Sequence, residues 1–195
     1  GPGTQLFIGT SEGTGKIVQD GAGSLVSIDS SSNAFVFGYS GSVGVDGGVG
    51  SYELHAGTFE YSGTLGIVFG SSAGGTGTFT QTGGSFTAEG PVTVGGNGTG
   101  LYELSGGSAV MGVLRIGDGA GAGAVTQSGS ATAEINGGIV FGAGSTAASY
   151  TLSGGSLTLA GGISGGNANS DFILNGGTLI AASGFTAAST FATSV

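Results

Sequence analysis

The sequence predicts an all-β fold, a parallel β-helix (β-solenoid) that is right-handed and has three short strands in each coil. Short stretches of alternating apolar and polar residues recur along the whole chain, which is the strand pattern. Glycine accounts for 48 of the 195 residues and separates these stretches. From Gly70 onward the pattern returns every 22 to 25 residues, which predicts about 7–8 coils of roughly 22–25 residues.

The glycine content by itself would also fit a disordered linker, but the rest of the composition argues against one. Hydrophobic residues make up 38% of the chain, charged residues only 7%, and proline occurs twice. Disordered chains are poor in apolar residues and rich in charge. We therefore expect the glycines to mark the corners of an ordered structure, where positive φ angles exclude other residues.

Two phrases alternate along the chain and define the strands of each coil. The first phrase, apolar–x–Leu/Gln–small–Gly–Gly–Ser/Thr–apolar, predicts two strands around a glycine corner, in copies such as YELHAGTF (52–59) and YTLSGGSL (150–157). The second phrase, apolar–x–apolar–Gly, predicts the third strand, as in VTVG (92–95) and in the degraded copy GISG (162–165).

Stacked coils place equivalent residues in columns, and four columns are expected to form the core. The first contains Ile17, Tyr52, Phe79, Tyr102, Val125, Tyr150 and Phe172. The second contains Gln19, Leu54, Gln81, Leu104, Gln127, Leu152 and Leu174. The third contains Leu25, Phe59, Phe86, Ala109, Thr132, Leu157 and Leu179, and the fourth contains Ile8, Phe37, Phe69, Val94, Ile116 and Phe141. A buried glutamine needs partners for its amide, so the glutamines either find them inside or lie near a corner.

Charge excludes several classes of partner. Lys16 and Arg115 are the only Lys or Arg residues against 11 acids, so the formal net charge is −9. Nucleic acids and anionic membrane surfaces require clustered basic residues, which this chain does not have. The sequence contains no cysteine and no apolar run long enough to span a membrane, so we expect no thiolate chemistry and no membrane insertion by this segment.

The domain organisation is expected to be simple. Residues 1–3 (Gly-Pro-Gly) are interpreted as a cloning remnant, and residues 4–195 as a single β-solenoid domain belonging to a longer protein. Residues 10–34 and 181–195 break the rhythm and are expected to be irregular regions that cap the two ends. Without caps, the open strand edges would let copies associate end to end.

The phrases YTLSGGSLTLAG and TFTQTGGSFTAEGPVTVGG resemble the Gly-rich β-strand repeats of bacterial autotransporter passenger domains and related large surface proteins. The resemblance covers roughly residues 4–195 and lies in the repeat pattern, not in a catalytic motif. It implies a right-handed β-helix, secreted or displayed on the cell surface, with adhesive or stalk-like roles. The membrane barrel that ends an autotransporter has no counterpart in this sequence.

The outward column of the first strand carries the acids that could act in catalysis. Glu53 and Glu103 lie two rungs apart, about 9.6 Å between backbones, near the upper limit of the 6.5–9.5 Å typical of inverting glycosidases. His55 shares the face with Glu53 and could titrate near neutrality. A sparse charge pattern that keeps the sheet soluble is the favoured interpretation, so we expect no enzyme activity.

Three other kinds of site are weighed and not favoured. Asp46 and Asp118 lie in Gly-rich turns, but most turns lack an acid, so no calcium or other cofactor is expected. The threonines of TGTFTQT (76–82) would need repetition on successive coils to form an ice-binding array. Asn97 in Asn-Gly-Thr fits a glycosylation acceptor and equally fits a turn.

The sequence thus predicts a structural or interaction segment of a secreted or cell-surface bacterial β-helix protein, similar to an adhesin passenger or stalk. Its expected partners are surface glycans or other copies of itself, end to end. A carbohydrate-binding module that uses Glu103 and exposed aromatics such as Tyr39 and Tyr61 is the alternative, and a polysaccharide-degrading enzyme is a more distant one.

Overall fold

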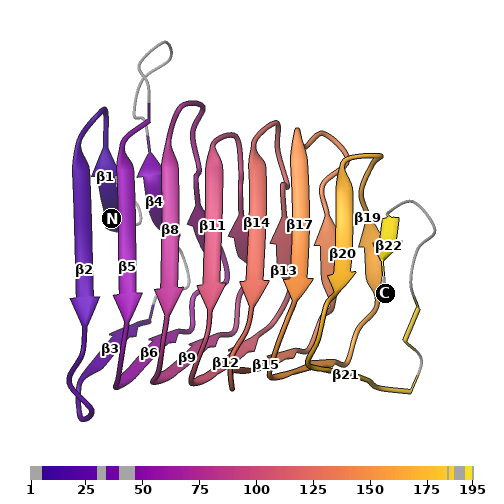
Figure 1. Cartoon of the computed structure of the whole chain (residues 1–195). Helices are drawn as coiled ribbons and strands as arrows, with labels where there is room; N and C mark the ends of the chain where they lie inside the picture. The colour runs from indigo at the N-terminus through magenta and orange to yellow at the C-terminus, as the bar shows by residue number, and fades with distance from the viewer. Residues whose placement is uncertain (1–5, 30–33, 40–46, 184, 187–191, 195) are drawn as a thin grey trace.

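A computed structural model confirms the parallel β-solenoid with three strands in each coil (Figure 1). It describes residues 6–29, 34–39, 47–183, 185–186 and 192–194. The described strands form three sheets of seven, eight and seven strands, and every neighbouring pair is parallel. No described strand pairs with its neighbour in sequence, because each coil contributes one strand to each sheet.

The three sheets are named here sheet A, sheet B and sheet C. Sheet A contains β1 (Leu6–Thr10), β4 (Phe35–Tyr39), β7 (Ile67–Phe69), β10 (Val92–Val94), β13 (Leu114–Ile116), β16 (Ile139–Phe141) and β19 (Ile163–Gly165). Sheet B contains β2 (Thr14–Gln19), β5 (Val49–Leu54), β8 (Thr76–Gln81), β11 (Thr99–Leu104), β14 (Ala122–Gln127), β17 (Ala147–Leu152), β20 (Ser170–Leu174) and β22 (Ala192–Ser194). Sheet C contains β3 (Leu25–Ile28), β6 (Thr58–Tyr61), β9 (Ser85–Ala88), β12 (Ser108–Met111), β15 (Thr132–Ile135), β18 (Ser156–Leu159) and β21 (Thr178–Ala181).

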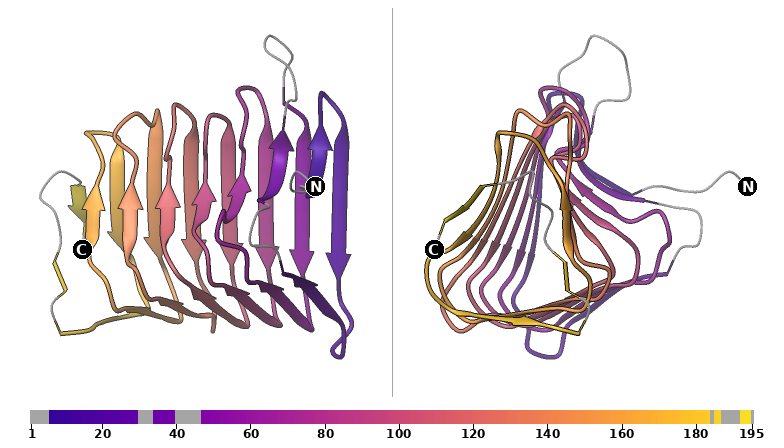
Figure 2. Two further views of the ribbon diagram at one scale, coloured as in Figure 1. Left: turned by 180° about the vertical axis from the view of Figure 1, so that it is seen from behind. Right: turned by 90° about the vertical axis from the view of Figure 1, so that its right-hand side faces the viewer.

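The coil is right-handed, as the sequence predicts. In Figure 1 the chain descends at the front in β5, crosses the bottom in β6, rises behind in the strands of sheet A and returns at the front in β8, one step to the right. Seen along the axis, the coil is narrow at the top, where sheet A leads into sheet B, and wide at sheet C (Figure 2).

A column of small residues explains the narrow corner and was missed from the sequence. The first inward position of each sheet B strand lies two residues before the first core column. It holds Gly15, Gly50, Gly77, Gly100, Gly123, Ala148 and Ser170. A Cβ added to Gly77 would lie 2.3 Å from the backbone nitrogen of Gly70, the residue that follows β7 of sheet A. The two sheets approach too closely there for any larger side chain in the middle coils.

The predicted core columns are confirmed except at two places in sheet C. Leu25 is 62% exposed and pairs with Thr58, while Val26 pairs with the buried Phe59. Thr132 is likewise exposed, and Ala133 takes its place inside the coil. Both corners that precede these strands are longer than in the other coils. Because side chains alternate along a strand, a register error of one residue moves the side chain to the opposite face.

The glutamines lie fully inside the coil and are not displaced to a corner. Gln81 and Gln127 are 0% exposed, and Gln19 is 5% exposed. The Nε2 of Gln81 donates to Ser108 O at 2.9 Å in sheet C, and its Oε1 accepts from the hydroxyl of Tyr102, one coil further on, at 2.9 Å. Each buried amide thereby has a donor and an acceptor, which removes most of the cost of burying it.

The same cluster occurs three times, in every second coil. The hydroxyls of Tyr52, Tyr102 and Tyr150 donate to the Oε1 atoms of Gln19, Gln81 and Gln127 at 2.5, 2.9 and 2.6 Å, respectively. In the other coils a leucine replaces the glutamine, and the next coil holds Phe or Val in place of the tyrosine, as with Leu54 and Phe79. The true repeat of the molecule is therefore a pair of coils.

The ends of the described chain differ from the expectation of irregular caps. Residues 10–34 contain β2 and β3, which pair in register with the second coil, so the prediction of an irregular region there is wrong. At the other end, Ile163 N donates to Thr186 O at 2.8 Å, and β22 pairs with β20. The segment after β21 thus begins an eighth coil.

Candidate functional site

The outer face of sheet B brings the predicted acids into one column. Glu53 on β5 and Glu103 on β11 both pair with Thr80 on β8, so one strand separates them, as predicted. The Thr80 hydroxyl donates to Glu103 Oε2 at 3.4 Å. The column places the two carboxylates on one exposed wall.

Glu53 is engaged by the cation and the histidine of its own face. Lys16 Nζ lies 2.6 Å from Glu53 Oε1, and His55 Nε2 lies 3.4 Å from Glu53 Oε2. The hydrogen bond from Lys16, and secondly that from His55, lower the pKa of the Glu53 carboxyl below its usual range. Glu53 is therefore ionised at neutral pH.

His55 also reaches the next coil. Its Nδ1 lies 2.8 Å from Thr82 Oγ1, so the hydroxyl donates to Nδ1 in the tautomer that carries its proton on Nε2. Lys16, Glu53, His55 and Thr82 thus form a polar chain across three adjacent coils. These side chains are exposed, so their contribution to the free energy of unfolding is small.

This geometry gives little support to acid catalysis. A glycosidase acid needs a raised pKa so that it stays protonated near neutrality, whereas the pKa of Glu53 is lowered. Glu103 is exposed and accepts a hydrogen bond from a threonine hydroxyl. Holding adjacent coils together is the role that these contacts favour.

The two aromatic candidates differ in accessibility. Tyr39 is half-buried, and its ring stacks on Phe7 at a centroid distance of 4.4 Å on the outside of sheet A. Tyr61 is only 1% exposed, so the expectation of an exposed aromatic is wrong there. The Tyr61 hydroxyl accepts from Gly66 N at 3.0 Å. Burial, opposed by that hydrogen bond, raises the pKa of Tyr61.

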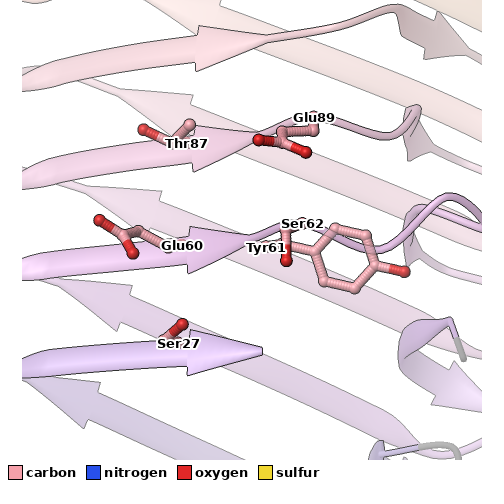
Figure 3. A pocket seen from close by; sticks show the side chains of 6 residues that line it. All are labelled: Ser27, Glu60, Tyr61, Ser62, Thr87 and Glu89. Carbon is pink, nitrogen blue, oxygen red and sulfur yellow. The ribbon is translucent and has the colours of Figure 1, made fainter. Parts of the chain in front are cut away.

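A pocket on sheet C was not anticipated from the sequence (Figure 3). It has a volume of about 280 Å³ and is lined by Ser27, Glu60, Tyr61, Ser62, Thr87 and Glu89. Figure 3 shows Glu60 on β6 and Glu89 in the connection just after β9. The outward position of Glu60 between Phe59 and Tyr61 was the available sequence signal.

The turn residues do not assemble a larger site. Asp118 lies 3.5 Å from Arg115 in an exposed ion pair, and Asp46 lies outside the described residues. Within the described part of the chain, no three His, Cys, Asp or Glu side chains are grouped so that they could hold a metal ion. Thr78 and Thr80 are flanked on the next strand by Leu101 and Glu103, so the threonine array is interrupted.

No protein-family model, curated protein or solved structure matches this chain. None of the described residues forms a helix long and apolar enough to cross a membrane.

Proposed function

We propose that this chain is a structural and interaction segment of a secreted or cell-surface bacterial β-helix protein, with the role of an adhesin passenger or stalk. The observation that carries the proposal is the unbroken stacking of coils in all three sheets. Each coil adds one rung, about 4.8 Å, along the axis. Repeat number therefore sets length, and each repeat contacts only its neighbours.

The surface chemistry supports the same role. The outward positions of sheet B are mainly Ser, Thr and Glu, and the net charge is −9, which favours solubility and few strong contacts. A long repetitive face of this kind suits weak contacts that gain strength by multivalency. Surface glycans and further copies of the chain are the partners that this chemistry fits.

A carbohydrate-binding module is the second candidate, and one observation favours it. The stack of Tyr39 on Phe7 leaves aromatic surface half-exposed on sheet A. Such rings offer an apolar face for a sugar ring, with polar neighbours to orient it. Glu103 on sheet B faces another side of the coil and would require a separate contact.

Incubation of the purified chain with a panel of bacterial, plant and host polysaccharides tests these alternatives. Bound protein and released unsaturated or reducing ends are measured in the same samples. A stalk whose contacts are individually weak and depend on multivalency gives neither signal when the chain is assayed as single copies. Binding without product that is lost in Tyr39→Ala but kept in Glu103→Gln supports the module, and product that is lost in Glu53→Gln or Glu103→Gln overturns both proposals.

A further inference from the structure

Three Asn-Gly pairs occur in the sequence, and the fold places one in each kind of corner. Asn97–Gly98 joins sheet A to sheet B, Asn136–Gly137 joins sheet C to sheet A, and Asn175–Gly176 joins sheet B to sheet C. In such a pair the glycine nitrogen can attack the side-chain amide carbon of the asparagine, because no Cβ obstructs the approach. The sequence alone makes the three pairs equivalent.

Two of the pairs are held in the hydrogen-bonded stack. Gly98 N donates to Gly70 O at 2.9 Å, and Gly137 N donates to Gly112 O at 2.5 Å. The Asn97 side chain is also engaged, since its Oδ1 accepts from Ala120 N at 3.4 Å. The attacking nitrogen at these two corners must first leave its carbonyl in the preceding coil, which requires local opening.

Asn175–Gly176 has no such restraint. Among the residues that the structure describes, no backbone carbonyl accepts a hydrogen bond from Gly176 N, and no side-chain hydrogen bond holds the Asn175 amide. Asn175 and Gly176 are both exposed. Gly176 has a φ of +135°, a conformation that favours glycine at this position.

We propose that Asn175 is a site of spontaneous modification, at which the chain converts its own amide into a carboxylate. Gly176 N forms a bond to Asn175 Cγ, the bond from Cγ to Nδ2 breaks, and ammonia leaves with the proton from Gly176 N. Water then opens the cyclic imide at either carbonyl. One product is aspartate, and the other is isoaspartate, in which the main chain passes through the side-chain carbon.

The modification changes the last coil of sheet C. Asn175 lies between β20 and β21, and Leu179 of β21 pairs with Leu157 of β18. Isoaspartate lengthens the main chain by one carbon at this corner, which disturbs the register that the pairing requires. The earlier coils hold Asp20, His55, Thr82, Ser105, Ser128 and Ser153 at the equivalent corner position, and none of these side chains carries an amide that could be lost.

Peptide mass spectrometry of the folded chain after incubation in warm, mildly alkaline buffer tests the proposal. The peptide that contains Asn175 should lose its amide at least about tenfold faster than those with Asn97 or Asn136, the factor that a local opening free energy of about 1.4 kcal/mol imposes. In denaturant the three sites should react at similar rates. The Asn175→Ser variant, which copies Ser153, should fold normally and abolish the rapid phase.

Equal rates at the three sites in the folded chain would overturn the proposal, as would faster reaction at Asn97 or Asn136. The same rate order in folded and denatured chains would also overturn it, because the selectivity would then come from local sequence. A second readout is enzymatic labelling of isoaspartate. Among the three Asn-Gly peptides, the label should appear first in the one that contains Asn175.

Discussion

At the residue scale, the buried Gln–Tyr clusters are the chemistry that most constrains this fold. Gln81 and Tyr102 contribute polar atoms to an interior otherwise made of aromatic and branched side chains. A buried polar group that keeps its partner costs little, whereas one that loses it costs its full desolvation. The clusters therefore select the correct pairing of adjacent coils more than they add to the free energy of unfolding.

We expect Tyr102→Phe to lower the free energy of unfolding by about 1–3 kcal/mol, because Gln81 Oε1 loses its donor inside the coil. The double variant Gln81→Leu/Tyr102→Phe should recover most of the loss, since it reproduces the Leu54 and Phe79 pair already present in the chain. Urea unfolding followed by circular dichroism measures both. A double variant less stable than the single one would contradict this account.

Burial of the tyrosines also predicts sensitivity to alkali. Burial raises the pKa of Tyr52 from 10.0 to about 12 and also raises those of Tyr102 and Tyr150. The folded state holds these phenol protons more tightly than the unfolded state. The contribution of the tyrosines to the free energy of unfolding is therefore complete below pH 10 and declines as the pH rises from 10 toward 12. Titration of unfolding free energy against pH should show this fall.

A variant with Leu and Phe at all three Gln–Tyr clusters provides the control for the alkaline titration. It should lose most of the decline above pH 10, since the phenol groups responsible are gone. An unchanged alkaline transition in that variant would assign the effect to other groups.

At the scale of the element, one coil is not an independent unit. We call a coil with a buried glutamine in the second core column a Gln coil, and one with a tyrosine in the first core column a Tyr coil. A Gln coil must be followed by a Tyr coil, because the tyrosine hydroxyl donates its hydrogen bond to the glutamine of the preceding coil. The coils between clusters pair Leu with Phe or Val and need no such match. Repeats can therefore be added in pairs without leaving a buried polar group unsatisfied.

We expect tandem duplication of residues 76–121, a Gln coil and a Tyr coil, to preserve stability and to lengthen the molecule by about 9.6 Å. Duplication of residues 76–98 alone places Phe above Gln81 and leaves its Oε1 without a donor. That variant should have a lower urea midpoint. X-ray scattering gives the length, and equal midpoints for the two insertions would remove the argument for a two-coil unit.

At the scale of the whole molecule, the two end coils determine how the chain behaves in solution. Leu6, Val18 and Leu25 are exposed on the first coil, and β22 covers part of the seventh. A strand edge left open on a solenoid can pair with another copy. Residues after β21 protect one such edge, with Phe185 packed against the core.

Removal of residues 182–195 should therefore promote oligomers, because it uncovers the edge of β20 and frees the backbone amide of Ile163 in β19. Light scattering of the truncated and full chains measures the change. Ile173→Lys in the truncated chain should restore the monomer, because a lysine at an outward edge position opposes strand addition. A cleanly monomeric truncation without that substitution would rule the idea out.

The solenoid, its three strands per coil and most of its core can be predicted from the pattern of residues. Alternation specifies a strand, glycine specifies a corner, and repetition requires each coil to bury its apolar face on the next. The columns that begin at Ile8 and Ile17 follow directly from that pattern.

The remaining features became visible in the folded chain, because they depend on corner length and on contacts between coils. It placed Val26 and Ala133 inside in place of Leu25 and Thr132, since corner length sets the face on which a side chain falls. It buried Tyr61, joined Glu53 to Lys16 and His55, and gave each core glutamine its tyrosine. A hydrogen bond between residues more than twenty positions apart leaves no local signal in the pattern that predicts a strand.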